Sequence, residues 1–122
     1  MPAQRPHKFE YVSDLNGFRA PSWQVVRLGG RLNRKRDLFW AVAKGLKFPS
    51  FFGENWDALE ECLRDLSWLG PPAKVVLLHE QLPLADDCQR KVYFDILHNA
   101  QATGGVPLRV VFPASAGPDI GG

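Results

Sequence analysis

The sequence predicts an α/β fold in which a small three-stranded parallel sheet is connected by helical crossovers. Short runs of β-branched and aliphatic residues alternate with longer segments whose apolar residues recur every three or four positions. Glycine and proline pairs separate most of these segments and mark turns. Strands joined by helices run parallel and the crossovers are right-handed, so the order strand, helix, helix, strand, helix, strand predicts a layered domain.

Three runs have the composition of strands. The first is WQVVRL at residues 23–28, which a Gly-Gly turn closes. The second is KVVLLH at residues 74–79, and its unalternating apolar centre is typical of a strand covered on both faces. The third is LRVVF at residues 108–112. We expect these three strands to form the sheet.

Three helices are expected between and beside the strands. Asn33 or Asp37 could cap the first, which must end before an FP pair because proline disfavours helical geometry in the residue before it. The second begins near Asn55 and runs to a GPP turn, with an apolar stripe that is typical of an amphipathic helix. The third begins at Asp86 or Asp87, and a GG pair closes it after about residue 102.

The composition is that of one compact domain. A chain of 122 residues with 45% hydrophobic composition is long enough to bury a stable core without disulfide or metal cross-links. No stretch approaches the roughly 18 apolar residues of a membrane span, and the first residues lack the apolar core of a signal peptide, so we expect no membrane partner and a cytoplasmic location. We expect residues 1–22 to be a partly ordered N-terminal arm, residues 23–112 the domain, and residues 113–122 a flexible tail.

No pattern in the chain indicates catalysis or a cofactor. Cys62 and Cys88 lie in helical patterns without CxxC or Cys/His spacing, so reduced, structural thiols are the preferred interpretation, with a disulfide left open. The three histidines are too dispersed to suggest a metal site. A Gly-rich phosphate loop, a GxSxG elbow and an HExxH motif are all missing. His79 and Glu80 end a strand, where polar residues usually form an exposed loop. We therefore expect no metal, no cofactor and no enzymatic activity.

Charge is unevenly distributed although the net charge is only +2. One acid accompanies seven bases in the segment 27–47, namely Arg27, Arg31, Arg34, Lys35, Arg36, Lys44 and Lys47. One base accompanies five acids in the segment 50–69, namely Glu54, Asp57, Glu60, Glu61 and Asp65. The middle of the chain therefore has two parts of opposite electrostatic character.

The acids of the second helix are more numerous than helix stability explains. Glu54 and Asp57 suit the helix N-terminus, where the dipole favours anions by about 0.3 to 1 kcal/mol each. However, Glu61 lies four residues from both Asp57 and Asp65, and each such like-charge pair costs about 0.2 to 0.5 kcal/mol. A helix shaped by folding alone would carry a lysine at one of these positions. An acidic face that meets a cationic partner is therefore preferred over a merely solvated one.

The loop before this helix carries two adjacent aromatic residues. Phe51 and Phe52 cannot easily face the same way, so one is expected to anchor the loop while the other stays near solvent, unless both are buried. Exposed aromatics beside charges are common in binding hot spots. Gly53 suits a turn that a Cβ atom would obstruct.

The stretch FPSFFGENWDALEECLRDL resembles the signature of the barstar family, the intracellular ribonuclease inhibitors and related immunity proteins. An aromatic pair, then GEN, a Trp, DAL and a Cys-Leu pair one turn later carry the resemblance over residues 48–69. The order of elements over residues 23–112 agrees with the family. The first 22 and the last ten residues lie outside the resemblance.

The resemblance implies a barstar-like layer fold and a function in which the loop and second helix block the active site of a ribonuclease. The partner would be a cognate ribonuclease or another toxin with a cationic active site, and the free protein would be a monomer. Glu61 stands where the best known member has an aspartate that mimics a substrate phosphate. The resemblance assigns the interface to Phe51, Phe52, Gly53, Asn55, Trp56, Asp57, Glu60 and Glu61.

Some positions depart from the family pattern. Glu60 replaces a tryptophan, Phe51 and Phe52 replace tyrosines and so lose two hydroxyl donors, and Asn99 replaces an acid of the third helix.

The basic segment 27–47 supports an alternative function, nucleic-acid binding. Its bases cluster around a turn and a helix start, and such clusters can follow phosphates. No known motif and no alternation of aromatic and basic residues accompany them, so nucleic acid is not the expected partner.

Overall fold

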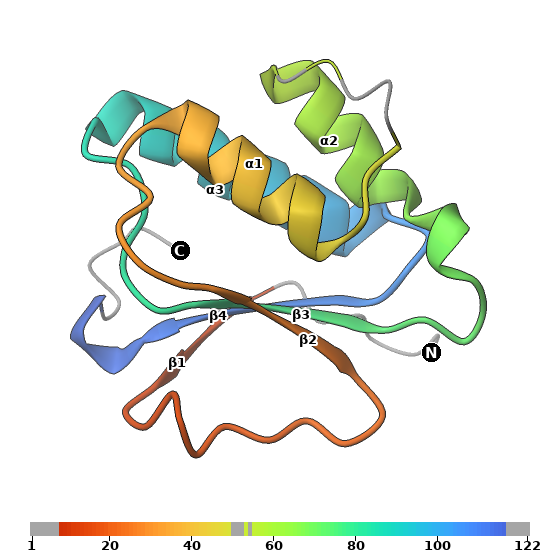
Figure 1. The fold of residues 1–122 in the computed structure, drawn as a ribbon, viewed down its shortest axis with the longest axis horizontal. Helices are drawn as coiled ribbons and strands as arrows, with labels where there is room; N and C mark the ends of the chain where they lie inside the picture. The colour runs from red at the N-terminus through yellow and green to blue at the C-terminus, as the bar shows by residue number, and fades with distance from the viewer. Residues whose placement is uncertain (1–7, 50–52, 54, 117–122) are drawn as a thin grey trace.

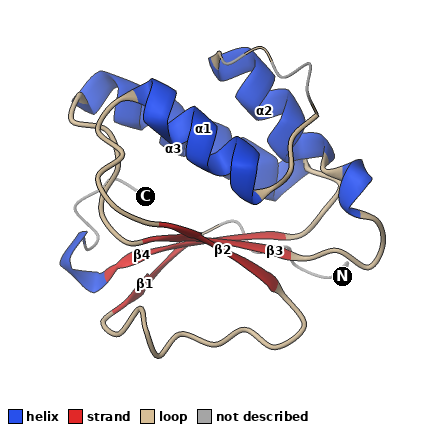
Figure 2. Ribbon diagram, viewed as in Figure 1, coloured by secondary structure: helices blue, strands red, loops and turns tan. Residues whose placement is uncertain are grey.

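The computed structural model describes residues 8–49, 53 and 55–116, which form four parallel strands and three α-helices (Figures 1 and 2). The strands are β1 Phe9–Val12, β2 Gln24–Leu28, β3 Val75–His79 and β4 Leu108–Pro113. The helices are α1 Lys35–Gly45, α2 Trp56–Asp65 and α3 Asp87–Thr103, with short 3-10 turns at Ser67–Leu69 and Ala114–Ala116. The α/β class with a parallel sheet is therefore confirmed.

The sheet separates two apolar layers. Its order is β1-β4-β3-β2, all three helices lie on one face, and the segment 13–23 crosses the other face (Figure 1). On β3, Val75 and Leu77 face the main core under the helices. Val76 and Leu78 face the opposite layer, where Phe18 and other residues of the crossing segment pack. The prediction that this strand is covered on both faces is confirmed.

The prediction of three strands is wrong, because β1 adds a fourth at the edge next to β4. Phe9 is buried in the main core, where its ring stacks on His98 at 4.1 Å between centroids. On the other face, Glu10 binds Arg109 of β4 through two contacts of 2.6 and 2.8 Å. A four-residue run carries too little periodicity to be recognised, and its partner strand lies at the far end of the chain.

Helix α1 begins without either predicted cap. Its N-cap is Arg34, whose side chain makes no capping hydrogen bond, so both Asn33 and Asp37 were wrong as caps. The C-terminal prediction holds, because the helix ends at Gly45, before Phe48. The chain between β2 and α1 is held instead by tertiary backbone contacts.

Helix α2 starts as predicted and ends earlier. Asn55 is its N-cap and accepts a hydrogen bond from the Ala58 amide at 2.8 Å. The helix stops at Asp65, because Leu66 adopts the left-handed conformation with φ of 51° and still buries its side chain completely. Packing of this leucine, rather than the later GPP turn, therefore ends the helix.

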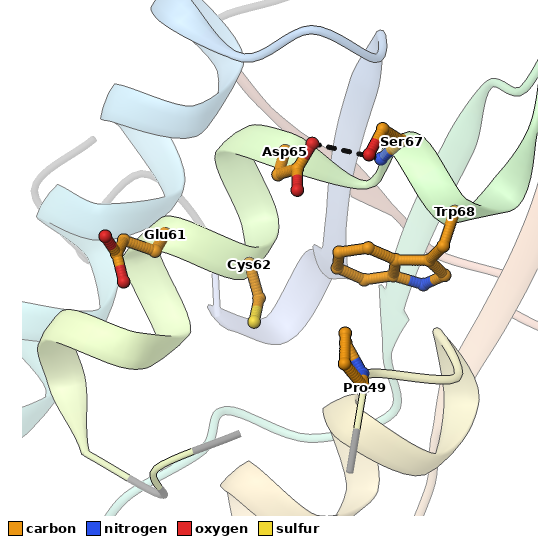
Figure 3. A pocket seen from close by; sticks show the side chains of 6 residues that line it. All are labelled: Pro49, Glu61, Cys62, Asp65, Ser67 and Trp68. Carbon is orange, nitrogen blue, oxygen red and sulfur yellow. Dashed lines mark hydrogen bonds between the residues drawn. The ribbon is translucent and has the colours of Figure 1, made fainter. Parts of the chain in front are cut away.

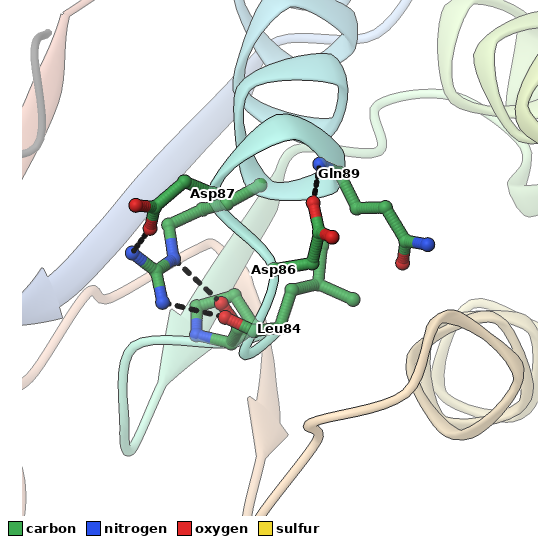
Figure 4. A network of polar contacts seen from close by, with 6 residues as sticks. Leu84, Asp86, Asp87 and Gln89 are labelled. Atoms are coloured by element: carbon green, nitrogen blue, oxygen red, sulfur yellow. Dashed lines mark hydrogen bonds and ion pairs between the residues drawn. The ribbon is translucent and has the colours of Figure 1, made fainter.

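A polar network fixes the start of α3 (Figure 4). Asp86 is the N-cap, as predicted, and accepts from the Gln89 amide at 2.9 Å. Arg90 donates to the carbonyls of Pro83 and Leu84 and contacts Asp87 at 3.1 Å. The turn between β3 and α3 is therefore tied to the helix that follows it.

Candidate functional site

The predicted interface begins at the capped start of α2. The Asn55 side chain accepts from the Ala58 amide and also donates to the Gly53 carbonyl at 3.4 Å. A Cβ atom at Gly53 would come within 3.3 Å of the Asn55 amide nitrogen, so glycine allows this close approach. The short turn thereby orients the first residues of the helix.

One side of α2 is anchored in the core. Leu59 and Leu63 are completely buried. Trp56 is half-buried, and its ring lies edge-on to Phe39 at 4.9 Å and tilted to Tyr93 at 6.4 Å. The structure thus gives Trp56 a core contact that the interface prediction did not include, and leaves part of its side chain at the surface.

The opposite side of α2 is acidic and exposed. Asp57, Glu61 and Asp65 are exposed, whereas Glu60 is half-buried and lies 3.9 Å from Arg64. In the described part of the chain, no cation comes within ion-pairing distance of Asp57 or Glu61. These two carboxylates, four residues apart on one helix, are therefore available to an external cation.

A pocket of about 500 Å³ borders this helix (Figure 3). It is lined by Pro49, Glu61, Cys62, Asp65, Ser67 and Trp68. Trp68 closes one side, where its indole donates to the Leu46 carbonyl at 2.9 Å and its ring lies edge-on to Phe48 at 5.8 Å. The sequence prediction missed Trp68, because only folding brings the end of α1 against the end of α2.

The pocket thiol is held in its neutral form. Burial, and then the charges of Glu61 and Asp65, raise the pKa of Cys62. A raised pKa lowers the thiolate fraction and hence the nucleophilicity of the sulfur. Cys62 is buried, Cys88 is exposed, and both are free in the structure.

The interpretation of His79 as part of an exposed loop is wrong. His79 is buried, and its Nδ1 lies 3.1 Å from the Val111 carbonyl, which can only accept, so Nδ1 carries the proton. The Nε2 atom then accepts from the Tyr93 hydroxyl at 2.7 Å. Burial lowers the pKa of His79 to about 4 and raises the pKa of Tyr93. The pair is satisfied within the core and presents no proton acceptor to solvent.

The structure brings six of the eight predicted interface residues together at the surface side and start of α2. These are Gly53, Asn55, Trp56, Asp57, Glu60 and Glu61. Phe51 and Phe52 lie outside the described residues, and so does Glu54. Their predicted contribution to an interface stays a prediction.

Metal and membrane sites are not part of the described structure. Within the described ranges, no three His, Cys, Asp or Glu side chains gather in a group that could hold a metal ion. No helix in these ranges combines the length and apolar composition that a bilayer crossing requires.

Together, the fold and this site define a small α/β domain that offers a capped, carboxylate-bearing helix at its surface. The chain belongs to the barstar family, since the family model described as Barstar (barnase inhibitor) matches residues 23–113, well over half of its length. No curated protein matches the chain. The match begins at residue 23, directly before β2, so strand β1 and residues 13–22 lie outside it.

Proposed function

We propose that this protein is an inhibitor that blocks the active site of a ribonuclease, or of a related toxin, with the acidic face of α2. The observation that carries the proposal is the exposed carboxylate pair of Asp57 and Glu61, which has no ion-pair partner in the described ranges, on a helix that buried leucines anchor. Membership of an inhibitor family supports the same function. The protein performs no chemistry of its own.

The mechanism is competition for the cationic groups that a nuclease presents to the scissile phosphate. A carboxylate placed at that position makes charge-assisted hydrogen bonds to the same Arg, Lys or His side chains. Because Asn55 caps the helix and two buried leucines anchor it, little backbone freedom of the helix is lost on binding. The inhibitor thus occupies the substrate site without being cleaved.

Opposed charges also accelerate the encounter. Electrostatic steering raises association rate constants up to about 10⁸ to 10⁹ M⁻¹ s⁻¹ at low salt, a range that was itself established on pairs such as barnase and barstar. Screening shortens the range of this attraction, so raising the salt from about 50 to 500 mM slows association. A salt-independent rate would instead indicate an apolar interface built around Trp56.

The test replaces Glu61 and measures inhibition. Purified protein is titrated into an RNA-cleavage assay with barnase and with any ribonuclease encoded beside its gene. Glu61→Ala should weaken inhibition of the nuclease that the wild type blocks by about 30-fold or more, because it leaves a buried cation of the target unpaired.

Asp95→Ala is the matched control, since Asp95 is also an exposed helical acid but lies on α3. It should leave inhibition unchanged. A change of less than threefold for Glu61→Ala, or equal losses for both variants, would contradict the role assigned to the acidic face.

A further inference from the structure

A second surface site lies at the start of α1. A pocket of about 490 Å³ opens between the turn after β2 and the first turns of α1. Its lining includes Arg31, Leu32, Arg36, Asp37, Trp40 and Ala41. Its volume is within the range of small-molecule sites, about 300 to 1,000 Å³. The proposed inhibitory function does not use this pocket.

Trp40 is the outstanding side chain of this pocket. It is 64% exposed, the largest exposure among the large hydrophobic residues in the described chain, whereas its neighbours Leu38 and Phe39 are buried. The Lys44 ammonium lies 4.8 Å from the centre of its ring. A solvated indole beside a cation offers a flat aromatic surface in a positive environment.

The arginines around this indole have no ion-pair partner among the described residues. In the described part of the chain, Arg31, Arg34 and Arg36 take part in no ion pair. Glu80, which lies beside Gly29 of the pocket lining, is already bound to Arg27 at 2.9 Å. Among the described residues that line the pocket, Asp37 is the one acid beside two arginines. The site therefore has an excess of positive charge available to an anion.

The turn that carries Leu32 is held in place by the neighbouring loop. Leu84 donates its amide to the Leu32 carbonyl at 2.8 Å, and Ala85 donates to the Asn33 carbonyl at 3.2 Å. The Leu84 end of this contact belongs to the network that fixes the start of α3 (Figure 4). The pocket wall is thus built before any ligand arrives.

We propose that this pocket binds single-stranded RNA, with a base stacked on Trp40 and phosphates on Arg31 and Arg36. An exposed indole stacks on any unpaired base, and guanidiniums bind phosphate oxygens in two-point contacts. Duplex bases are already stacked, so the strand must be single. The Asp37 carboxylate accepts a hydrogen bond, and the ribose 2′-hydroxyl beside each phosphate supplies a donor that DNA lacks.

The lysines and arginines outside the pocket extend the site along a strand. Lys35 and Arg34 precede the pocket residues of α1, and Lys44 follows one helical turn beyond Trp40. A strand that leaves the pocket in either direction meets a further cation. The aromatic residue among these bases was overlooked at the sequence level, because one tryptophan between Arg36 and Lys44 does not form an alternating pattern.

The experiment measures fluorescence anisotropy of labelled oligo(rU)10 with the full chain at 50 and 200 mM salt. We expect saturable binding that weakens as salt rises, because released counterions drive phosphate binding. Trp40→Ala should weaken binding about tenfold, which is the loss of one stacked base. Arg31→Gln and Arg36→Gln should each weaken it severalfold and flatten the salt dependence.

Matched controls lie on α3. Lys91→Gln removes one exposed positive charge, and Val92→Ala removes exposed apolar surface, and neither should change RNA binding. Thermal melting of each variant shows that it folds, and Trp40→Phe should retain most of the affinity because it keeps an aromatic surface. Glu61→Ala should bind RNA as the wild type does, so failure of this site and failure of the inhibitory function are distinguishable.

Several outcomes would overturn the proposal. They are an absence of saturable binding at 50 mM salt, a Trp40→Ala variant that binds as the wild type does, and a duplex bound as well as the single strand. Equal affinity for oligo(dT)10 would contradict the role of Asp37, and equal affinity for uridine monophosphate would contradict an extended strand. Displacement of RNA by a poly-glutamate peptide at the same charge concentration would indicate an acidic protein as the occupant.

Discussion

His79 shows how a single polar side chain becomes part of the core. It ends β3 on the helix side of the sheet, stacks on Phe112 at 4.3 Å and shares a hydrogen bond with Tyr93 of α3. Both ring nitrogens are satisfied only in the neutral form with the proton on Nδ1. Protonating Nε2 would place two donors against each other, unless the tyrosine turned its hydroxyl away, and would bury a charge.

Stability should therefore fall as the pH falls from 6.5 to 4. The folded state holds the pKa of His79 at about 4 against about 6.5 when the residue is exposed, so the unfolded state takes up the proton first. Above pH 6.5 the depressed pKa of His79 does not change the free energy of unfolding, and near pH 4 it lowers that free energy by about 3 kcal/mol. Urea unfolding between pH 4 and 7 measures this slope.

Two variants separate His79 from other titrating groups. His79→Gln should lower stability at pH 7 but remove this part of the pH dependence. His98→Gln is the control and should keep the dependence, because it leaves the contacts of His79 with Val111 and Tyr93 in place. Identical slopes for His79→Gln and the wild type would show that the buried imidazole does not titrate in this range.

At the scale of the element, α2 combines a stable anchor with a destabilising charge pattern. Its buried leucines and its Asn55 cap favour the helix. Its exposed acids repel one another, since Glu61 lies four residues from both Asp57 and Asp65. Such a pattern is expected where binding, rather than folding, determines the surface residues.

Glu61→Lys should reveal this conflict directly. It converts two like-charge contacts into two attractive ones, so the free energy of unfolding should rise by about 1 kcal/mol. The same change should abolish inhibition, because a cation then faces the cationic target. Thermal melting and the RNA-cleavage assay measure the two effects on one protein, and a variant that is both less stable and fully inhibitory would contradict both.

The contact between α1 and β2 depends on a residue without a side chain. A Cβ atom at Gly45 would overlap Cγ1 of Val26, which is buried in the strand below. Glycine near a helix end usually reflects backbone conformation, but here it allows the last turn of α1 to approach the sheet. The approach determines how closely the helix layer covers β2.

Gly45→Ala should therefore destabilise the protein by about 1 to 3 kcal/mol, the usual cost of overpacking a core. At an ordinary helical position the same substitution stabilises by up to about 1 kcal/mol. Adding Val26→Ala should recover part of the loss, and a double-mutant cycle in urea measures the coupling. A gain in stability for Gly45→Ala alone would show that the close approach is not constrained.

At the scale of the molecule, residues ahead of β2 complete the second layer of the protein. In the segment 13–23, Phe18 and Trp23 pack toward Val76, Leu78 and Val111 of the sheet. The Arg109 guanidinium lies 5.4 Å from the Phe18 ring and 5.2 Å from the Trp23 ring while it binds Glu10. The segment thus covers apolar strand surface that would otherwise meet water (Figure 2).

Removal of residues 1–22 should uncover this face. The truncated chain should melt at a lower temperature, bind a hydrophobic dye and associate, because the sheet loses both β1 and its cover. Phe18→Ala in the full chain should cost about 1 to 3 kcal/mol, less than a fully buried phenylalanine, since its side chain is half-buried. A monomeric truncated protein with unchanged melting would contradict this role of the segment.

Much of the fold could be predicted because its signals are local. The apolar stripe of α2, its Asn55 cap and the two-sided burial of β3 each follow from neighbouring residues, and the structure confirms all three. The exposed positions of Asp57 and Glu61 follow from the same helical periodicity. The caps of α1 failed because the chain before that helix is held by contacts with a distant loop.

The sequence by itself determined the helices, three of the strands and the acidic face, because hydrophobic period and charge spacing act over a few residues. Only the tertiary structure decided what depends on residues far apart in the chain. Strand β1 needs β4 as its partner, His79 needs Tyr93 and Val111, and the pocket at Trp40 needs the turn after β2 beside α1. The free energy that stabilises the strand, the buried histidine and the pocket comes from burial and pairing that exist only after the chain has folded.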